Sequence, residues 1–343
     1  MRCLRPIILI LAMLLMLGAV SCGASDEPKS ATYYEYFDTV CHISSYRGAT
    51  ESDAEFEQIC EELEELLERY HRLLDIYHEY EGVNNLATVN RRAGVSATEV
   101  SQELIDLLLY GREVYYLTSG EVNIAMGSVL SLWHRAREGG ASLPSVEELT
   151  LAASHTSIDS VVIDKAAGTV YLSDEMASID VGAIGKGYVA ERAAELLESR
   201  GIESYVINLG GNIRAVGQKP DGEGWVTGIT KPYGSDGEFV SRVVLSDASC
   251  VTSGSYQRYF EVDGKKYHHI IDKDTLYPSE HFASVSVIAA DSALADALST
   301  ALFSMTYEEG LDLCDSIGNL HVIWVRNDGK ILTSEGIDAI IAN

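Results

Sequence analysis

The sequence predicts an α+β fold, of mixed α/β character, in which mostly antiparallel sheets pack against helices in one or two lobes. Helix-like and strand-like segments are intermingled without the strict β-α-β alternation that a parallel sheet requires. The 343 residues are 46% hydrophobic and 22% charged, which is a globular composition and a length sufficient for a large core. No internal repeat or clean linker interrupts the chain, which indicates one continuous unit.

The first half of that unit predicts a strand pair followed by helices. Residues 31–48 alternate and are rich in aromatic and β-branched residues, as paired strands are. Residues 52–77 place apolar side chains at helical spacing, with Ser52 as N-cap and Glu55 completing a capping box. A second helix is predicted over 101–120, where Gly120 ends it.

The second half predicts more strands, with two helices between them. Residues 157–183 indicate strand, turn, strand and strand, and residues 188–201 a helix. Residues 204–217 predict a strand that ends in a glycine turn. Several short strands follow over 225–288, and a helix over 290–305 precedes a terminal strand pair.

The N-terminus predicts export. Residues 1–21 combine two arginines, an apolar run and small residues, as a secretory signal peptide does, and are too short for a good spanning helix. Ser21 before Cys22 is typical of a bacterial lipoprotein processing site, which would make Cys22 the lipidated first residue. Residues 22–31 then form a lipoprotein tether, and 32–343 the folded domain. We expect the protein on the outer face of the bacterial cytoplasmic membrane or in the periplasm. The alternative is an ordinary cleaved signal in which Cys22 is incidental.

Charge and cysteine content exclude several classes of partner and site. A formal net charge of −27 disfavours nucleic acid and electrostatic docking on anionic lipid, so membrane contact is expected only through the lipid anchor. Cys41, Cys60, Cys250 and Cys314 show no CxxC spacing and no histidine at zinc-finger distance. We therefore expect buried single thiols, with no zinc site and no essential disulfide.

A glycine-rich loop at 182–187, with the sequence GAIGKG, precedes a predicted helix. It lacks the spacing and the final hydroxyl residue of a Walker motif. Its small residues nevertheless expose backbone N–H groups near a helix N-terminus, where a phosphate is favoured and Lys186 could add charge. The alternative is a tight turn with a solvated lysine.

Two further glycine motifs are weak on their own. The double glycine in NLGGNI, residues 208–213, is most often a plain turn. In VTSGSYQRYF, residues 251–260, Ser253 lacks the GxSxG pattern of a nucleophile elbow, which disfavours a serine hydrolase.

Two histidines and a helical Asp-Thr pair are the remaining candidates. His268 and His269 lie on a predicted strand before Asp272, and only one of them can face a given site because strand residues alternate. Asp296 and Thr300, at i and i+4, would share one helix face and could hold a hard cation through oxygen. The alternative for Asp296 and Thr300 is an ordinary Thr–Asp pair on the protein surface.

The order of these motifs resembles that of the ApbE family, the FAD:protein FMN transferases. The resemblance runs from about Thr32 to the C-terminus and is thinner before Gly120. It rests on five stretches: IDVGAIGKGYVAE, INLGGNIRAVG, VTSGSYQRYF, HHIIDKDTLYP and SVSVIAADSALADALSTALF.

The resemblance implies an ApbE-like fold and a specific reaction. A family enzyme binds FAD and Mg²⁺, cleaves the pyrophosphate, joins FMN to a threonine hydroxyl of a flavoprotein and releases AMP. The implied partners are acceptor flavoproteins with a modifiable threonine, either membrane redox subunits or extracellular flavoproteins.

The resemblance also implies roles for individual residues. His269 is the expected base for the threonine proton, and Asp180 either shares that role or orients a partner. The metal would be held by the Ala183 carbonyl, Asp296 and Thr300. The remaining positions are expected at the cofactor: Phe37, Tyr77, Glu121, Val122, Asn123, Asp180, Lys186 and Ile270.

Departures from the family pattern leave alternatives open. Asn123 stands where an aspartate is usual, and the loop after Asp272 lacks the usual Pro-Arg, which puts the adenosine contacts and the loop shape in doubt. A Mg²⁺-dependent FAD diphosphatase, with water as acceptor, remains a rival. A non-catalytic flavin-binding lipoprotein is the second.

Overall fold

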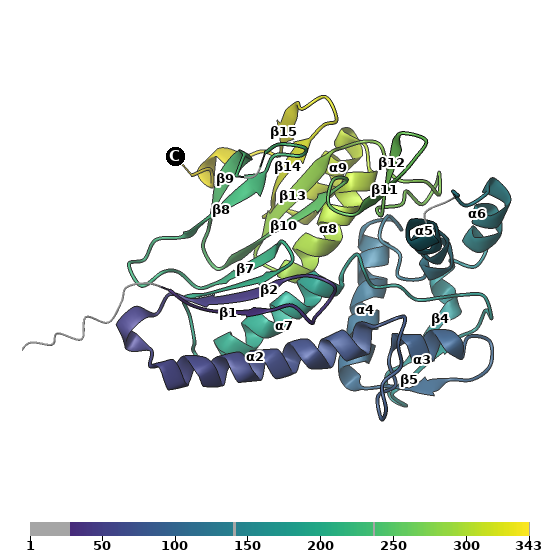
Figure 1. Ribbon diagram of the computed structural model, residues 1–343, viewed down its shortest axis with the longest axis horizontal. Helices are drawn as coiled ribbons and strands as arrows, with labels where there is room; N and C mark the ends of the chain where they lie inside the picture. The colour runs from purple at the N-terminus through teal and green to yellow at the C-terminus, as the bar shows by residue number, and fades with distance from the viewer. Residues whose placement is uncertain (1–27, 140–141, 236, 343) are drawn as a thin grey trace, which may run out of the picture.

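The computed structural model describes residues 28–139, 142–235 and 237–342. It has two lobes (Figure 1): a large sheet with helices α2, α7 and α8 packed beneath it, and a smaller lobe built from helices α3 to α6 and a small sheet. The α+β prediction is therefore confirmed.

The large sheet has eight strands in the order β1-β2-β6-β7-β10-β13-β14-β15, and each neighbouring pair is antiparallel. The predicted N-terminal strand pair is confirmed as β1 against β2. The strands of this sheet are Lys29–Tyr33, Cys41–Ser45, Tyr205–Leu209, Asn212–Val216, Ala248–Gly254, Ser284–Ala289, His321–Val325 and Ile331–Thr333.

Side chains alternate between the two faces of this sheet because successive strand residues point in opposite directions. Ile207 of β6 and Val287 of β13 face cores shared with the helices, whereas Ile288 faces a different core. That second face is covered by the hairpin β8 (Trp225–Thr230) and β9 (Phe239–Leu245). The sheet is thus buried on both faces.

Helices α7 (Gly185–Ser199) and α8 (Ser292–Ser304) lie side by side against the sheet, and α2 (Asp53–Leu74) packs on α7. Helix α2 starts where the sequence indicates, because Ser52 Oγ accepts from the Glu55 N–H at 3.1 Å. The predicted capping box is wrong in its second half, since the Glu55 carboxylate pairs with Arg47 instead.

The smaller lobe holds most of the elements that the sequence did not predict. Its helices besides the predicted α4 (Gln102–Leu117) are α3 (Leu86–Arg91), α5 (Gly127–Gly139) and α6 (Val146–Ala153). Its sheet has the order β3-β5-β4, formed by Thr98–Glu99, Thr169–Leu172 and Val161–Asp164. The third strand expected within 157–183 is wrong: residues 173–183 form bends, turns and irregular backbone, with one isolated bridge from Ser178 to Met126. Helix α9 (Tyr307–Ile317), in the large lobe, was also missed.

The N-terminal predictions fall largely outside the described residues. The signal peptide and Cys22 lie there, whereas strand β1 begins at Lys29, within the segment predicted as tether. Among the described residues, no helix is both long and apolar enough for a membrane span. The four predicted thiols, Cys41, Cys60, Cys250 and Cys314, are free and buried, as expected.

Candidate active site

The glycine-rich loop connects the two lobes. Asp180 donates its backbone N–H to the carbonyl of Ile124 in the smaller lobe at 2.9 Å, and its Oδ1 accepts from the Gly182 N–H at 2.8 Å. Helix α7 starts at Gly185, earlier than expected, so Lys186 and Gly187 lie in its first turn. The loop is therefore fixed from both ends, with a half-buried Ala183 between them.

The close approach that the glycines permit is to a carboxylate. The Gly187 N–H donates to Oδ2 of Asp296 on α8 at 2.7 Å. A Cβ on Gly187 would lie 2.3 Å from both the Asp296 Cβ and the Ser292 carbonyl oxygen. Only glycine fits there without displacing α8, so this residue sets how closely the two helices approach.

The buried carboxylate of Asp296 has its negative charge only partly offset by its neighbours. Burial raises its pKa, while the Lys186 ammonium and the Gly187 N–H oppose that rise. The Asn212 side chain on β7 also lowers the Asp296 pKa. A buried carboxylate with a single nearby cation is a favourable place for an additional positive charge.

Thr300 follows Asp296 by one helical turn, as predicted. Its hydroxyl lies 3.4 Å from Ser253 Oγ on β10, and Ser253 Oγ also bonds Ser299 Oγ at 2.8 Å. Within the described residues, no three His, Cys, Asp or Glu side chains cluster as a preformed metal cage. A site here would combine a carboxylate, a hydroxyl and a backbone carbonyl, which are the hard oxygen ligands that Mg²⁺ takes.

The two histidines separate as strand geometry predicts. Strand β12 (Lys265–His268) ends at His268, which is buried and whose Nε2 bonds the Ser279 carbonyl at 2.8 Å. His269 has accessible surface, and its Nδ1 bonds the Arg258 carbonyl at 3.2 Å. Desolvation, with Lys186 and Arg258 as further causes, lowers the pKa of His269 to about 3.

An N-terminal turn packs against the His269 loop. Phe37 and Asp38 have φ values of 56° and 51°, and the Phe37 N–H donates to His71 Nδ1 at 3.2 Å. The Arg258 guanidinium donates to the Asp38 carbonyl at 3.0 Å, across 220 residues of sequence. Phe37 is thereby brought to the loop that carries His269.

Tyr77 also lies near this site, together with a partner that the sequence did not reveal. The Tyr77 hydroxyl bonds His134 Nδ1 of α5, and the Tyr77 ring is 56% exposed. Burial and the nearby Asp180 charge raise the pKa of Tyr77 to about 12, and burial lowers that of His134. Both side chains therefore stay neutral beside Asp180 at neutral pH.

Of the residues predicted for the adenosine side, Glu121 contacts the loop after His269. Glu121 pairs with Lys273 at 3.3 Å, and burial raises the Glu121 pKa. Val122 is buried, so its backbone rather than its side chain is available to a ligand. Asn123 bonds the Thr156 carbonyl and the Ala125 N–H, both at 2.9 Å. Ile270 is buried in the core beneath His269.

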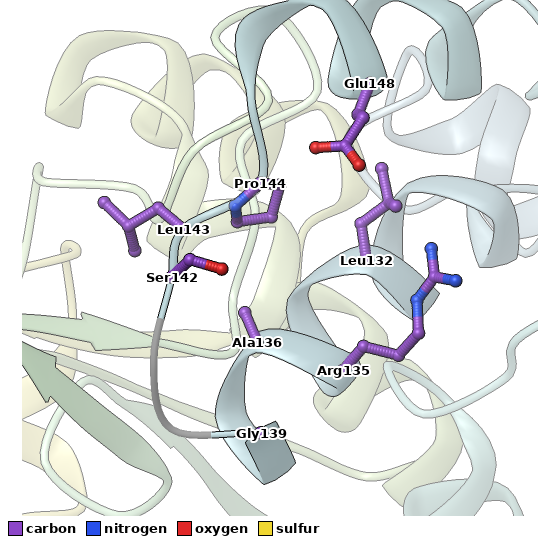
Figure 2. Close-up of a pocket in the computed structure, with 8 residues that line it drawn as sticks. All are labelled: Leu132, Arg135, Ala136, Gly139, Ser142, Leu143, Pro144 and Glu148. Carbon is purple, nitrogen blue, oxygen red and sulfur yellow. The ribbon is translucent and has the colours of Figure 1, made fainter.

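The structure thus brings Lys186 within electrostatic reach of both His269 and Asp296, and Asp180 lies in the loop that leads to Lys186. These four residues come from three separate segments of the chain. The structure adds Arg258, His134, Asn212 and Ser253, which sequence reasoning did not select. A separate pocket of about 230 Å³ between α5 and α6 (Figure 2) is lined by Leu132, Arg135, Glu148 and neighbours, and by none of the predicted site residues.

Comparison with known proteins decides the family. The model of the ApbE family matches residues 37–324. The chain belongs to the ApbE family. An ApbE-family relative in Klebsiella pneumoniae (strain 342), named FAD:protein FMN transferase, is 31% identical over 247 residues, which are 72% of this chain and 76% of that protein. One of the same name in Treponema pallidum is 30% identical over 340 residues, covering 94% and 92%.

Solved ApbE structures share the fold. The ApbE protein from Thermotoga maritima superposes with a TM-score of 0.82 at 28% identity, covering 92% of this chain and 100% of that one. The flavin transferase ApbE from Vibrio cholerae gives 0.77 at 26% identity, with the same coverage. The family resemblance, the ApbE-like fold and the expectation of a transferase enzyme are therefore confirmed.

Proposed function

We propose that this ApbE-family chain transfers FMN from FAD to a threonine hydroxyl of acceptor flavoproteins and releases AMP, in a Mg²⁺-dependent reaction. The observation that carries the proposal is the buried Asp296 carboxylate held against the first turn of α7, with Lys186 facing both it and His269. This arrangement offers a cation site and a neutral base that both interact with one lysine.

Asp296, Thr300 and the Ala183 carbonyl would hold the cation. Their fit rests on the hard oxygen donors that they offer: Asp296 is 4% exposed, and Thr300 follows it by one turn of α8. When bound, Mg²⁺ would neutralise charge on the diphosphate and assist its cleavage.

His269 has the protonation state that a general base needs. The Arg258 carbonyl can only accept a hydrogen bond, so His269 Nδ1 carries the proton and Nε2 keeps a free lone pair. Its lowered pKa keeps the ring neutral at neutral pH. We infer that Nε2 takes the proton of the acceptor hydroxyl as that oxygen bonds the phosphorus of the FMN half and the bond to AMP breaks.

The remaining predicted residues would position the dinucleotide. Lys186 supplies a positive charge for the phosphates, and Asp180 fixes the loop through Gly182. Tyr77 and Phe37 offer aromatic surface near the flavin. Glu121, Val122 and Asn123 would face the adenosine side.

A Mg²⁺-dependent FAD diphosphatase remains the second candidate. The accessible surface of His269 favours it, because water could reach the same Nε2. A non-catalytic flavin-binding lipoprotein would bind FAD without turnover.

One incubation separates these functions. The purified protein is mixed with FAD, Mg²⁺ and a flavin-acceptor domain, then resolved on a denaturing gel. Fluorescent acceptor with the added mass of FMN supports the transferase, whereas free FMN and AMP alone support the diphosphatase. No turnover, or full activity in excess EDTA, contradicts the proposal. An acceptor whose threonine is replaced by alanine is the matched control.

We also propose that the protein is exported and anchored through a lipid on Cys22. Membrane fractionation of the full chain and of Cys22→Ser tests this. We expect the first in the membrane fraction and the second released; equal distribution of the two would contradict the anchor.

A further inference from the structure

The NLGGNI motif places a buried amide next to the proposed cation site. Asn212 is the first residue of β7 and follows the Gly210-Gly211 turn, which the Asn208 side chain closes by accepting from the Gly211 N–H at 2.8 Å. Asn212 is 3% exposed. Its backbone position is therefore fixed, and its side chain is enclosed.

This amide has an unused donor. Asn212 Nδ2 makes no hydrogen bond within the described part of the chain, although it is buried. Native proteins pair most of their buried donors, so an unpaired one at a functional site points to a partner that forms only with ligand.

The partner within reach is the Asp296 carboxylate. Strand β7 packs against both α7 and α8. Two residues after Asn212, on the same face of β7, Arg214 bonds Glu191 of α7, and Glu191 accepts from the Ser292 N–H at the start of α8. The Asn212 side chain therefore faces the helix pair that carries Gly187 and Asp296. The Gly187 N–H already holds Oδ2 at 2.7 Å. The carboxylate therefore has a backbone donor from α7 and a side-chain donor from β7 beside it.

Thr300, the other proposed side-chain ligand of the cation, also has a polar neighbour behind it. Thr300 is backed by Ser253, which is itself bonded to Ser299. Groups that bond metal ligands from behind orient those ligands and tune metal affinity.

We propose that Asn212 is a positioning residue for the cation site, donating from Nδ2 to the Asp296 carboxylate so that this group is oriented toward the metal. This inference rests on the proposed function, because it assumes a divalent cation at Asp296. Asn212 acts on the metal ligand and contacts neither the metal nor the nucleotide.

The test replaces Asn212 with leucine, which has a similar volume and no donor. Mn²⁺ binding to the mature protein, followed by electron paramagnetic resonance, is expected to weaken about 10- to 100-fold. The Mg²⁺ concentration for half-maximal activity rises by the same factor, while kcat at saturating Mg²⁺ is unchanged. The Tm of the metal-free variant stays equal or rises, since an unpaired buried donor has been removed. FAD affinity without metal stays unchanged.

The matched control is Thr98→Val. Thr98 is 1% exposed and its Oγ1 is also unpaired, but it lies on β3 in the smaller lobe. The Mn²⁺ affinity of the Thr98→Val variant should equal that of the wild type. Asn212→Ala serves as a second variant if the leucine does not fold.

Each outcome separates this inference from the proposed function. Wild-type Mn²⁺ affinity in an Asn212 variant that folds overturns the positioning role alone. A changed FAD affinity without metal also overturns it, since Nδ2 would then contact the nucleotide. A wild-type protein that binds no Mn²⁺ contradicts the metal-dependent function itself.

Discussion

The backbone N–H of Gly187 donates to the carboxylate of Asp296 at 2.7 Å, and this contact joins the first turn of α7 to the middle of α8. The contact depends on the absence of a side chain at residue 187. It fixes a candidate metal ligand and, at the same time, the spacing of the two helices that support the large sheet.

The first prediction concerns that spacing. In Gly187→Ala the new Cβ would meet the Ser292 carbonyl, a backbone atom, at 2.3 Å, so α8 must shift. We expect a loss of about 1–3 kcal/mol in the free energy of unfolding, measured by urea denaturation, together with weaker metal binding.

Gly185→Ala is the matched control on the same helix. Its Cβ meets only side-chain ends, the Leu74 Cδ1 at 3.3 Å and the Val181 Cγ2 at 3.8 Å. Alanine favours the helix, so the control should be neutral or slightly stabilising. Equal losses in the two variants would contradict the close-approach argument.

The second prediction concerns the buried charges beside the site. Arg214 on β7 has a side chain 4% exposed and pairs with Glu191 at 3.2 Å and with Glu198 and Asp247 at 2.9 Å. Arg214→Ala leaves the buried Glu191 without its cation, so denaturant titration should show a loss of about 3–5 kcal/mol.

An exposed pair supplies the comparison. Arg200 bonds Glu62 with its side chain 42% exposed, and Arg200→Ala should cost less than about 1 kcal/mol. If both arginine variants were equally stable, the buried cluster would not hold α7 to the sheet.

The third prediction concerns His269 as a base. His269→Asn removes the Nε2 acceptor, so kcat should fall by about 10²- to 10⁴-fold while FAD affinity changes little. Single-turnover kinetics and fluorescence titration measure the two quantities. An unchanged kcat would mean that another residue acts as the general base, and Asp180 is the next candidate.

The fourth prediction follows from the pKa of His269, lowered from 6.5 to about 3. The unfolded chain protonates this imidazole near pH 6.5, whereas the folded protein does so only near pH 3. The contribution of neutral His269 to folding stability is therefore complete above pH 6.5 and is lost as the pH falls from there toward 3. His269→Gln should show a smaller fall in Tm between pH 6.5 and 4 than the wild type. If the Tm of the variant and of the wild type fell in parallel, the loss of stability at low pH would come from groups other than His269.

The fifth prediction concerns the Tyr77 ring. If it stacks on a ring of FAD, Tyr77→Ala should weaken FAD binding by about 1–3 kcal/mol, measured by flavin fluorescence. Tyr77→Phe keeps the ring and loses only the bond to His134, so its affinity should fall less. Equal affinity of all three proteins would place the ring away from the ligand.

Local patterns in the sequence predicted the elements that carry their own signals. The Ser52 cap, the helix bearing Asp296 and Thr300, and the opposite orientations of His268 and His269 all follow from spacing within a few residues. Helices α3, α5 and α6 were missed because they are short or have only part of their surface apolar.

Contacts between distant segments could not be predicted in the same way. Arg258 reaches Asp38 across 220 residues, and Tyr77 meets His134 on a helix that the sequence did not reveal. Asn212 looked like part of a turn, because its burial and its unused donor exist only once β7 lies against α8.

The order of strands in the large sheet has a consequence for biosynthesis. Cys41 of β2 pairs with Leu209 of β6, a separation of 209 − 41 = 168 residues, and β1 pairs only with β2. The first two strands to leave the ribosome can therefore pair with each other at once, but their hairpin joins the sheet only after well over half the polypeptide has been made. The core beneath this edge of the sheet thus closes late in synthesis, after β6 has left the ribosome.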